Sequence, residues 1–228
     1  MKKRLEKIIS SQNNLSRKEI KKEIKIGNVL VDGQIQKDPA FKINPLINKI
    51  VFKNEEIEYQ EFIYIVLNKP KNYVCATKDK DQSTIMDLIN RYNNFDLHIV
   101  GRLDKDTTGI VLLTNDGQWT HELKSPKKNV EKEYEVVLKN NLTEEMIINI
   151  QAEMKLDNKI LKPIKITNNV MNKCNITLTE GKYHQIKRMF YNVGNEVVEL
   201  NRIRVGNLKL NDLNLLIGEW KDIDKNLI

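Results

Sequence analysis

The stretch GRLDKDTTGIVLLTNDG, residues 101–117, sets charged and turn-forming residues directly before an apolar run. The run from Ile110 to Leu113 predicts a buried strand. Arg102, Asp104 and Asp106 precede it. One interpretation is a polar loop of the usual kind. The other is a rigid strand that holds a reactive carboxylate in one orientation.

The composition fits a globular chain without the marks of a membrane or secreted protein. Its 228 residues suit one large domain or two smaller ones, and 40% are hydrophobic, enough for a core. No apolar run approaches the roughly 18–20 residues that span a bilayer. The N-terminus has no long apolar segment and no cleavage site, so no secretory signal is indicated. Cys75 and Cys174 are isolated, which implies no zinc site or disulfide. We therefore expect a reduced, cytoplasmic location.

The excess positive charge is concentrated near the start of the chain. The net charge is +7, and residues 1–25 hold nine Lys and Arg against three Glu. A local basic excess of this kind favours a polyanionic partner, which we interpret as nucleic acid. An anionic membrane surface or a solvated lysine-rich face are the alternatives.

A short basic helix is predicted between Ser16 and Gly27. Ser16 and Glu19 have the spacing of a capping box, Ile20 and Ile24 recur at helical spacing, and Gly27 ends the pattern. One face of this helix would be apolar and the other basic. The basic residues of that face are Arg17, Lys18, Lys21, Lys22 and Lys25.

The first sixty residues resemble an S4 RNA-binding domain. The resemblance rests on the pattern RLEKII…LSRKEIKKEIKIGNVLVDGQ, in which Asp32-Gly33 also predicts a tight hairpin. It implies that the basic face lies along RNA phosphates, which supply affinity but little sequence choice. The RNA-binding residues that we expect are Arg4, Ser16, Arg17, Lys18, Lys21, Lys22 and Lys25.

The remainder of the chain predicts a second, larger domain. An acidic stretch, residues 54–62, is interpreted as the link, and we place the domains at 1–58 and 59–228. Strand-like runs cluster with few βαβ repeats, which favours an α+β domain with a mixed, largely antiparallel sheet. The strand-like runs are 62–70, 109–116, 131–138, 165–181 and 196–208, and the helical candidates are 84–92, 143–154 and 181–194.

Four stretches in this larger part resemble the motifs of the pseudouridine synthase family. They are KPKNYVCAT (69–77), GRLDKDTTGIVLLTNDG (101–117), EKEYEV (131–136) and EGKYHQIKRMFYNVGNEVVELNRIRVGNLKL (180–210). With the S4-like segment, the resemblance spans essentially the whole chain. Within the family, TNDGQWTHELKSP and YHQIKRMFYNVGNEVVEL resemble the RsuA-type members, which act on uridine 516 of 16S rRNA. The implied fold is an S4 domain followed by a pseudouridine synthase domain.

The resemblance also implies a set of catalytic residues. Asp104 matches the catalytic aspartate, which either attacks C1′ of the ribose or removes a sugar proton. Lys187 matches the cation that pairs with this aspartate, and Tyr134 the aromatic ring that stacks on the target base. Arg102 matches the base-flipping arginine, with a phosphate contact as the alternative. Arg188 adjoins Lys187 and could take its place.

No cofactor or metal site is expected. The isomerisation adds no group and involves no redox change, and the sequence holds no Walker loop, GxGxxG or metal-ligand cluster. Asp106 and Asp116 are interpreted as turn-capping residues. The dispersed histidines are interpreted as core or surface residues: His98, His121 and His184.

The expected substrate is therefore assembling 16S rRNA, modified by a monomer that needs no membrane and no small-molecule cofactor. Two alternatives stay open. One is a pseudouridine synthase that acts on 23S rRNA. The other is a non-catalytic S4-type RNA-binding assembly factor, although the presence of Asp104, Tyr134 and Lys187 together argues against it.

Overall fold

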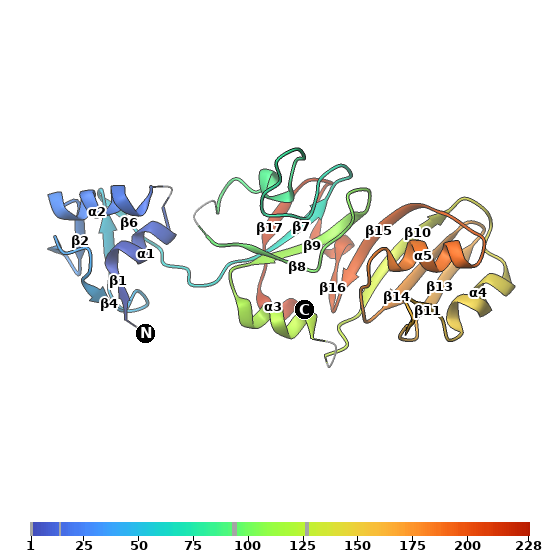
Figure 1. The fold of residues 1–228 in the computed structure, drawn as a ribbon. Helices are drawn as coiled ribbons and strands as arrows, with labels where there is room; N and C mark the ends of the chain where they lie inside the picture. The colour runs from blue at the N-terminus through green and yellow to red at the C-terminus, as the bar shows by residue number, and fades with distance from the viewer. Residues whose placement is uncertain (1, 14, 93–94, 126–127) are drawn as a thin grey trace. The chain divides into compact units, whose positions relative to one another are not determined.

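A computed structural model describes residues 2–13, 15–92, 95–125 and 128–228 (Figure 1). The chain forms two compact units. Residues 1–62 and 91–96 make the first, and residues 63–90 and 97–228 make the second. The expected domain boundary at residues 58/59 stays a prediction, because compactness alone does not show where a domain folds independently.

The first unit combines two helices with a four-stranded antiparallel sheet in the order β3-β2-β5-β6. A separate short pair joins β1 to β4. The elements are β1 (Lys3–Arg4), α1 (Leu5–Ser11), α2 (Arg17–Ile26), β2 (Val29–Val31), β3 (Gln34–Ile35), β4 (Lys42–Ile43), β5 (Ile50–Phe52) and β6 (Glu55–Glu56). The acidic stretch that we interpreted as a link thus begins inside the sheet, at β6.

The predicted helix α2 and its hairpin are confirmed. The Ser16 side chain accepts a hydrogen bond from the Glu19 backbone N–H, while the Glu19 carboxylate accepts from the Ser16 N–H at 2.8 Å. Gly27 ends the helix at φ 94°, in the left-handed region that glycine adopts without strain. Asp32 and Gly33 both have positive φ in the turn between β2 and β3.

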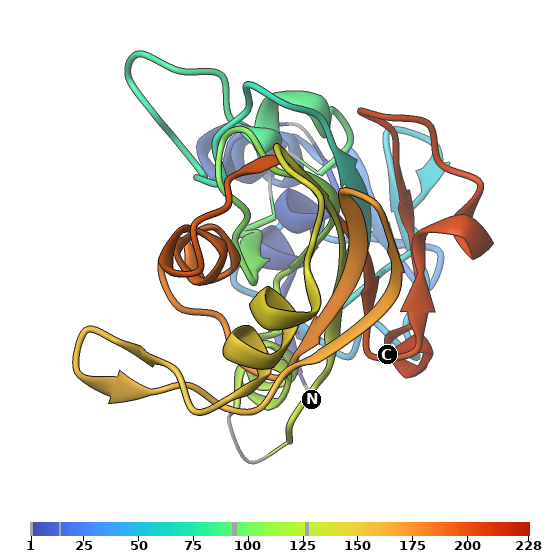
Figure 2. The ribbon, with the colours of Figure 1, turned by 90° about the vertical axis from the view of Figure 1, so that its right-hand side faces the viewer.

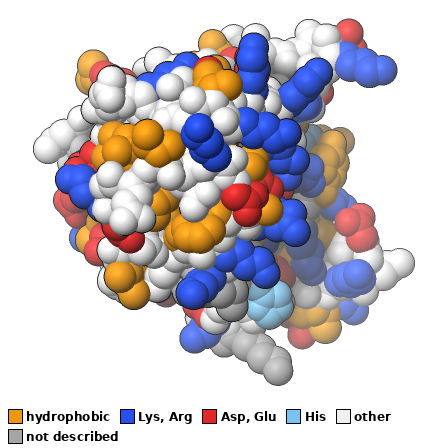
Figure 3. Space-filling model, turned by 90° about the vertical axis from the view of Figure 1, so that its left-hand side faces the viewer, with side chains coloured by type: hydrophobic (Ala, Val, Ile, Leu, Met, Phe, Trp, Pro, Cys, Tyr) orange, Lys and Arg blue, Asp and Glu red, His pale blue; other side chains and the backbone are white. Residues whose placement is uncertain are grey.

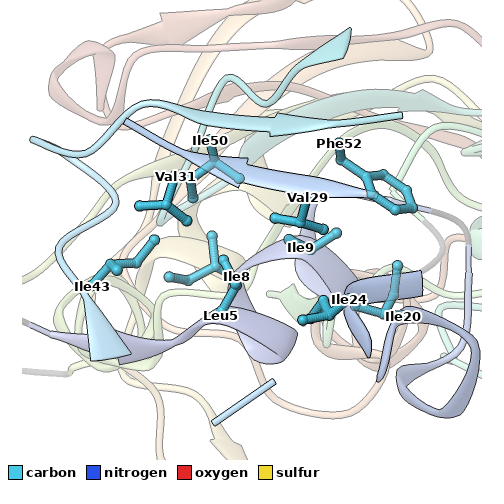
Figure 4. Close-up of a cluster of buried hydrophobic side chains, with 10 residues drawn as sticks. All are labelled: Leu5, Ile8, Ile9, Ile20, Ile24, Val29, Val31, Ile43, Ile50 and Phe52. Carbon is cyan, nitrogen blue, oxygen red and sulfur yellow. The ribbon is translucent and has the colours of Figure 1, made fainter. Parts of the chain in front are cut away.

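The core of the first unit lies between the helices and the sheet. Figure 4 shows ten aliphatic and aromatic side chains from α1, α2 and the strands that point toward one another. Full burial of each such side chain stabilises the fold by about 1.5–3 kcal/mol relative to exposure. The ten are Leu5, Ile8, Ile9, Ile20, Ile24, Val29, Val31, Ile43, Ile50 and Phe52.

The second unit is built on one nine-stranded sheet whose main path is β13-β14-β10-β15-β9-β7-β17. The β15–β9 pair is parallel, and every other pair in this sheet is antiparallel. The sheet strands are β7 (Tyr64–Lys69), β8 (His98–Val100), β9 (Thr108–Thr114), β10 (Lys132–Leu138), β13 (Lys165–Val170), β14 (Lys173–Leu178), β15 (Val197–Val205), β16 (Leu208–Lys209) and β17 (Trp220–Asp222). The predicted α+β class with a mixed, largely antiparallel sheet is confirmed.

Three helices and a hairpin accompany this sheet. Helix α5 packs against β15 and α4 against β13, and Figure 2 shows both helices on the same side of the sheet. The elements are α3 (Gly117–Lys124), α4 (Glu144–Gln151), α5 (Gln185–Asn192) and the hairpin of β11 (Lys155–Leu156) and β12 (Lys159–Ile160). No helix in the described ranges is both long and apolar enough to cross a membrane.

The helix predicted over residues 84–92 is wrong. The structure has only a short 3-10 helix, Ile85–Leu88. The Asp87 carboxylate accepts a hydrogen bond from the Thr84 backbone N–H at 2.7 Å, which closes a tight local turn. Ile85 and Ile89 are buried nonetheless, and the chain leaves the second unit after Asn90.

Candidate active site

Asp104 sits in a turn between the end of β8 and the start of β9. The Thr107 backbone N–H donates to the Asp104 carbonyl at 3.1 Å and closes the turn. Leu103 points into the core, while Arg102 and Asp104 on either side of it are not buried. This alternation is that of extended backbone, so the two charged side chains share one face, as the sequence predicted.

Gly109 explains why the turn lies so close to the neighbouring strand. It has φ 101°, and a Cβ added there would lie 2.3 Å from the Arg202 carbonyl oxygen and 2.7 Å from its backbone nitrogen. At this point β9 pairs in parallel with β15, with Gly109 opposite Arg202. Only glycine permits this close approach, which fixes the position of the turn on the sheet.

Lys69 holds the same turn from inside the protein. Its side chain is fully buried, and its ammonium donates to three carbonyl oxygens, those of Pro70 at 3.0 Å, Lys105 at 3.2 Å and Thr107 at 2.8 Å. Burial lowers the pKa of Lys69, and the acidic groups nearby oppose that shift. Two of the three carbonyls belong to the turn that carries Asp104, so Lys69 restricts its motion.

Arg202 is a second buried cation behind the turn, and the sequence reasoning missed it. Its side chain is 2% exposed and donates from Nε to the Ile110 carbonyl at 2.7 Å and from a terminal nitrogen to the Gly101 carbonyl at 3.0 Å. It also lies 3.5 Å from the Tyr134 hydroxyl. Arg202 therefore joins both ends of the 101–110 stretch to β10. The polar and apolar residues of ELNRIRV (199–205) gave no sequence signal that Arg202 is buried.

Two basic side chains face Asp104, one from α5 and one from the residue that precedes it. Lys187 Nζ lies 3.4 Å from Asp104 Oδ2, and His184 Nε2 lies 3.5 Å from Asp104 Oδ1. Lys187 is closer still to Asp106, at 2.6 Å. Burial would raise the pKa of Asp106, but the hydrogen bond and charge of Lys187 outweigh it, and the pKa lies below its usual value. Lys187 is thus shared by two carboxylates of one turn.

His184 was interpreted as a core or surface residue, and the structure places it beside Asp104 instead. It precedes α5 with φ 49°, and its ring stacks on Tyr183 with centroids 3.8 Å apart. His184 and Lys187 are three residues apart, which puts them on one side of the first helical turn. That spacing, together with the predicted Asp104–Lys187 pair, was the signal available in the sequence.

A small cavity lies beside Asp104, and Tyr134 of β10 is part of its lining. Tyr134 is 8% exposed, and it stands opposite Arg202 in the β10–β15 register. The cavity has a volume of about 100 Å³. Its lining brings together four of the predicted site residues: Arg102, Asp104, Tyr134 and Lys187.

Arg188 is not brought to this cavity. Its guanidinium makes a bidentate pair with the Asp157 carboxylate of the β11–β12 turn, at 2.6 and 2.9 Å. Arg188 follows Lys187 on α5 and therefore projects in another direction. Its expected role in the site gains no support from this position, whereas that of Lys187 does.

Over the described parts of the chain, no group of three or more His, Cys, Asp and Glu side chains could hold a metal ion. The expected independence from metals and cofactors stays a prediction. What the cavity offers is a fixed carboxylate with two basic side chains and an aromatic ring, a set suited to acid–base or nucleophilic chemistry on a planar group.

The predicted RNA-binding face of the first unit is exposed. Arg17, Lys18, Lys21, Lys22 and Lys25 all face solvent along α2, and none has a hydrogen-bond or ion-pair partner in the described structure. Figure 3 shows Lys and Arg side chains gathered toward one side of the face it presents.

Two other predicted RNA contacts, Arg4 and Ser16, have side-chain partners within the protein. Arg4 is exposed, with Glu6 at 4.0 Å. The Ser16 hydroxyl donates to Glu19 at 2.6 Å and is already used by the cap of α2. All seven RNA contacts stay predictions.

The comparisons with known proteins agree with this fold. Residues 63–192 match the family described as RNA pseudouridylate synthase, and residues 3–45 match the S4 domain. The chain therefore belongs to the RNA pseudouridylate synthase family, and it carries an S4 domain ahead of the catalytic part. The expected enzyme class, a pseudouridine synthase, is confirmed.

Individual relatives are similar over nearly the full chain. The chain is 38% identical over 227 residues to the ribosomal small subunit pseudouridine synthase A of Escherichia coli (strain K12), which covers 99% of this chain and 98% of that protein. It is 40% identical over 226 residues to the uncharacterized RNA pseudouridine synthase YtzG of Bacillus subtilis (strain 168), covering 96% and 94%. A crystal structure of a pseudouridylate synthase superposes with a TM-score of 0.68 at 36% identity, over 98% of this chain and 96% of that one.

Proposed function

We propose that this enzyme converts one uridine of 16S rRNA, uridine 516, to pseudouridine while the small ribosomal subunit is assembling. The observation that carries the chemistry is the position of Asp104, fixed on the sheet with Lys187 and His184 within 3.5 Å. The choice of 16S rRNA is supported by the similarity to small-subunit synthases of several bacteria. The proposal includes a cytoplasmic monomer without a cofactor.

In this reaction the N1–C1′ bond breaks, the uracil turns and a C5–C1′ bond forms, while C5 loses a proton and N1 gains one. Asp104 starts the reaction as a carboxylate, either by attack on C1′ or by removal of a sugar proton. The neighbouring Lys187 and His184 contact its two oxygens and restrict its orientation. Both routes need the carboxylate in one place, which the turn provides.

Tyr134 and Arg102 handle the base in this proposal. The Tyr134 ring gives the uracil an aromatic face on which it can turn without leaving. Arg102 has no hydrogen-bond or ion-pair partner among the described residues, so its guanidinium can occupy the space that the extruded base leaves in the RNA. Extrusion of a stacked base costs a few kcal/mol, which such a contact offsets.

The assembly window follows from the cost of extrusion. Mature subunits hold their RNA rigidly, whereas free RNA lacks the local shape that proteins recognise. We expect purified enzyme to modify an early assembly particle faster than free 16S RNA or mature 30S subunits, and free 23S RNA least. Preferential modification of 23S RNA would assign the enzyme to the large subunit. Equal rates on mature 30S subunits would contradict the assembly window and leave the chemistry unaffected.

A further inference from the structure

A second and larger cavity adjoins the one that holds Asp104. Its volume is about 430 Å³, against about 100 Å³ for the Asp104 cavity. Ligand sites in proteins typically have roughly 300–1,000 Å³, so the larger cavity has room for a nucleotide-sized group in addition to the one at Asp104. The two cavities share four lining residues: Arg102, Tyr134, Gly181 and Lys182.

The larger cavity has an apolar floor and a cationic rim. Apolar side chains from α3 and the sheet make the floor, and they suit the face of a base. The floor consists of Val100, Leu112, Leu123 and Val205, and the cations are Arg102, Lys124, Lys132, Lys182 and Arg202. Glu180 is the acidic residue of the lining, and it already accepts hydrogen bonds from the Gln185 side chain and the Lys162 backbone N–H, both at 3.0 Å.

Lys182 lies 3.9 Å from the Glu180 carboxylate, but two other cations of the lining are not neutralised in this way. Lys132 donates to the Val130 carbonyl at 3.1 Å and Lys124 to the Ile99 carbonyl at 3.1 Å, and neither has a carboxylate partner in the described structure. Burial lowers the pKa of Lys132, and the nearby positive charges of Arg202 and Lys162 lower it further. An anionic group in the cavity would relieve this repulsion, which favours a phosphate.

We propose that the larger cavity binds a second nucleotide of the RNA, the one next to the target uridine. Its base would lie on the apolar floor and its phosphate beside Lys132 and Lys182. Because the two cavities share Arg102 and Tyr134 in their linings, adjacent nucleotides of one strand can reach both. The inference rests on the proposed function only in that the substrate is RNA. If it is correct, the enzyme selects its site by the base next to the target uridine as well as by the uridine itself.

The test combines RNAs that lack the base next to the target uridine with protein variants in which a larger side chain fills the cavity. The RNA that the wild-type enzyme modifies is prepared intact, or with an abasic residue directly 5′ or directly 3′ of the target uridine. Leu123→Trp, on α3, and Thr179→Trp, directly after β14, each place a larger side chain in the lining of the cavity. Val170→Trp, at a side chain that is 65% exposed on β13, is the matched control.

Wild-type enzyme should lose roughly fivefold to a hundredfold in kcat/KM on one of the two abasic RNAs, the range typical of one stacked base. On intact RNA, a folded cavity-filling variant should lose a similar factor in kcat/KM. On that abasic RNA, its kcat/KM should fall no further than that of the wild-type enzyme. Val170→Trp should behave as wild type on all three RNAs. Indifference of the wild-type enzyme to both abasic positions would overturn the inference. So would an equal loss by both filling variants on all three RNAs, because that pattern places the target uridine itself in the larger cavity.

The activity of the wild-type enzyme on early assembly particles that carry intact 16S RNA tests the proposed function by itself. If it is inactive there, the same comparison is made on the RNA whose pseudouridine disappears from cells without the enzyme. A failure of the 16S assignment and a failure of the second nucleotide site thus give different results.

Discussion

Asp104 is held by the backbone around it and by two buried cations. Lys69 binds two carbonyls of its turn, and Arg202 binds the carbonyls at the two ends of the 101–110 stretch. A carboxylate that must react in one orientation gains from a support of this kind, because freedom of movement lowers the fraction of productive encounters. The support comes from β7 and β15, far from Asp104 in sequence.

Replacing Asp104 by Asn keeps the size of the side chain and removes its charge. We expect no detectable pseudouridine from the purified Asp104→Asn enzyme, with RNA affinity near that of wild type, because affinity comes mainly from phosphate contacts. Single-turnover formation of pseudouridine and a binding isotherm on the same RNA measure the two quantities. Substantial turnover in this variant would reject Asp104 as the catalytic residue.

Gly109→Ala should lower the free energy of unfolding by about 2 kcal/mol or more. The new methyl group would meet the backbone of Arg202, and alanine at φ 101° is itself strained. Gly117→Ala is the matched control, since nothing lies within 4 Å of its would-be Cβ and the residue begins α3. Urea denaturation measures both variants. Equal free energies of unfolding for the two variants would show that β15 leaves room for a methyl group at residue 109.

The resemblance to the family predicted four of the residues that the structure brings together at the site. Asp104, Tyr134, Lys187 and Arg102 line one cavity. His184 was missed because a lone histidine has no pattern of its own until the Asp104–Lys187 pair is placed in space. Arg202 was missed for a related reason: burial of a charged side chain depends on carbonyl partners 92 and 101 residues away in the chain.

At the scale of elements, α3 shows how one side chain begins a helix. The Asp116 carboxylate accepts hydrogen bonds from the backbone N–H groups of Gln118 at 3.0 Å and Trp119 at 3.1 Å, and from the Tyr64 hydroxyl at 2.8 Å. Burial would raise the pKa of Asp116, but these donors outweigh it and the pKa lies below the usual value. Asp116 thus links β7 to α3, a role beyond the turn capping that the sequence suggested.

Asp116→Ala should reduce stability by about 1–2 kcal/mol near neutral pH, the size of a lost helix cap. The folded-state pKa is depressed, so this contribution is present above the unfolded pKa of about 3.9. It is lost as the pH falls through the lower folded value. The stability difference between wild type and variant should therefore shrink as the pH is lowered from about 5 toward 2.

Thermal unfolding across this pH range measures the effect of Asp116. Asp212→Ala, at an exposed carboxylate in the second unit, serves as its control. A pH-independent difference between wild type and Asp116→Ala would show that the lost packing, and not the charged cap, matters.

Elements with a strong local pattern were predicted, and those defined by tertiary contacts were not. The run 109–116 became β9 and the capped segment 16–27 became α2, because continuous apolar sequence and capping residues act locally. The spacing over 84–92 suggested a helix equally well, but its chain turns after Leu88. The strand β17 is only three residues long and depends on its pairing with β7, a contact that periodicity cannot reveal.

At the scale of the whole molecule, the uncompensated charge of α2 is expected to anchor the RNA. Replacing Arg17, Lys21 and Lys25 by Ala should weaken binding and flatten its log–log salt dependence by up to about three units. Turnover at saturating RNA should change far less, because these side chains are absent from the lining of the Asp104 cavity.

The matched control for the α2 variant removes three exposed lysines from β11, β13 and β14, which changes the net charge equally. These lysines are Lys155, Lys165 and Lys173. Unchanged affinity and salt slope in the α2 variant would show that its basic face is only solvated. Equal losses in both variants would show that affinity follows total charge and not the α2 face.

The proposed function is the formation of one pseudouridine in 16S rRNA through Asp104. Mapping of pseudouridines at nucleotide resolution in 16S and 23S rRNA, from cells with and without the protein, tests it most directly. We predict that one site disappears, uridine 516 of 16S rRNA, and that it returns with the wild-type gene but not with Asp104→Asn. An unchanged 16S map, or the loss of a site in 23S rRNA instead, would contradict the account.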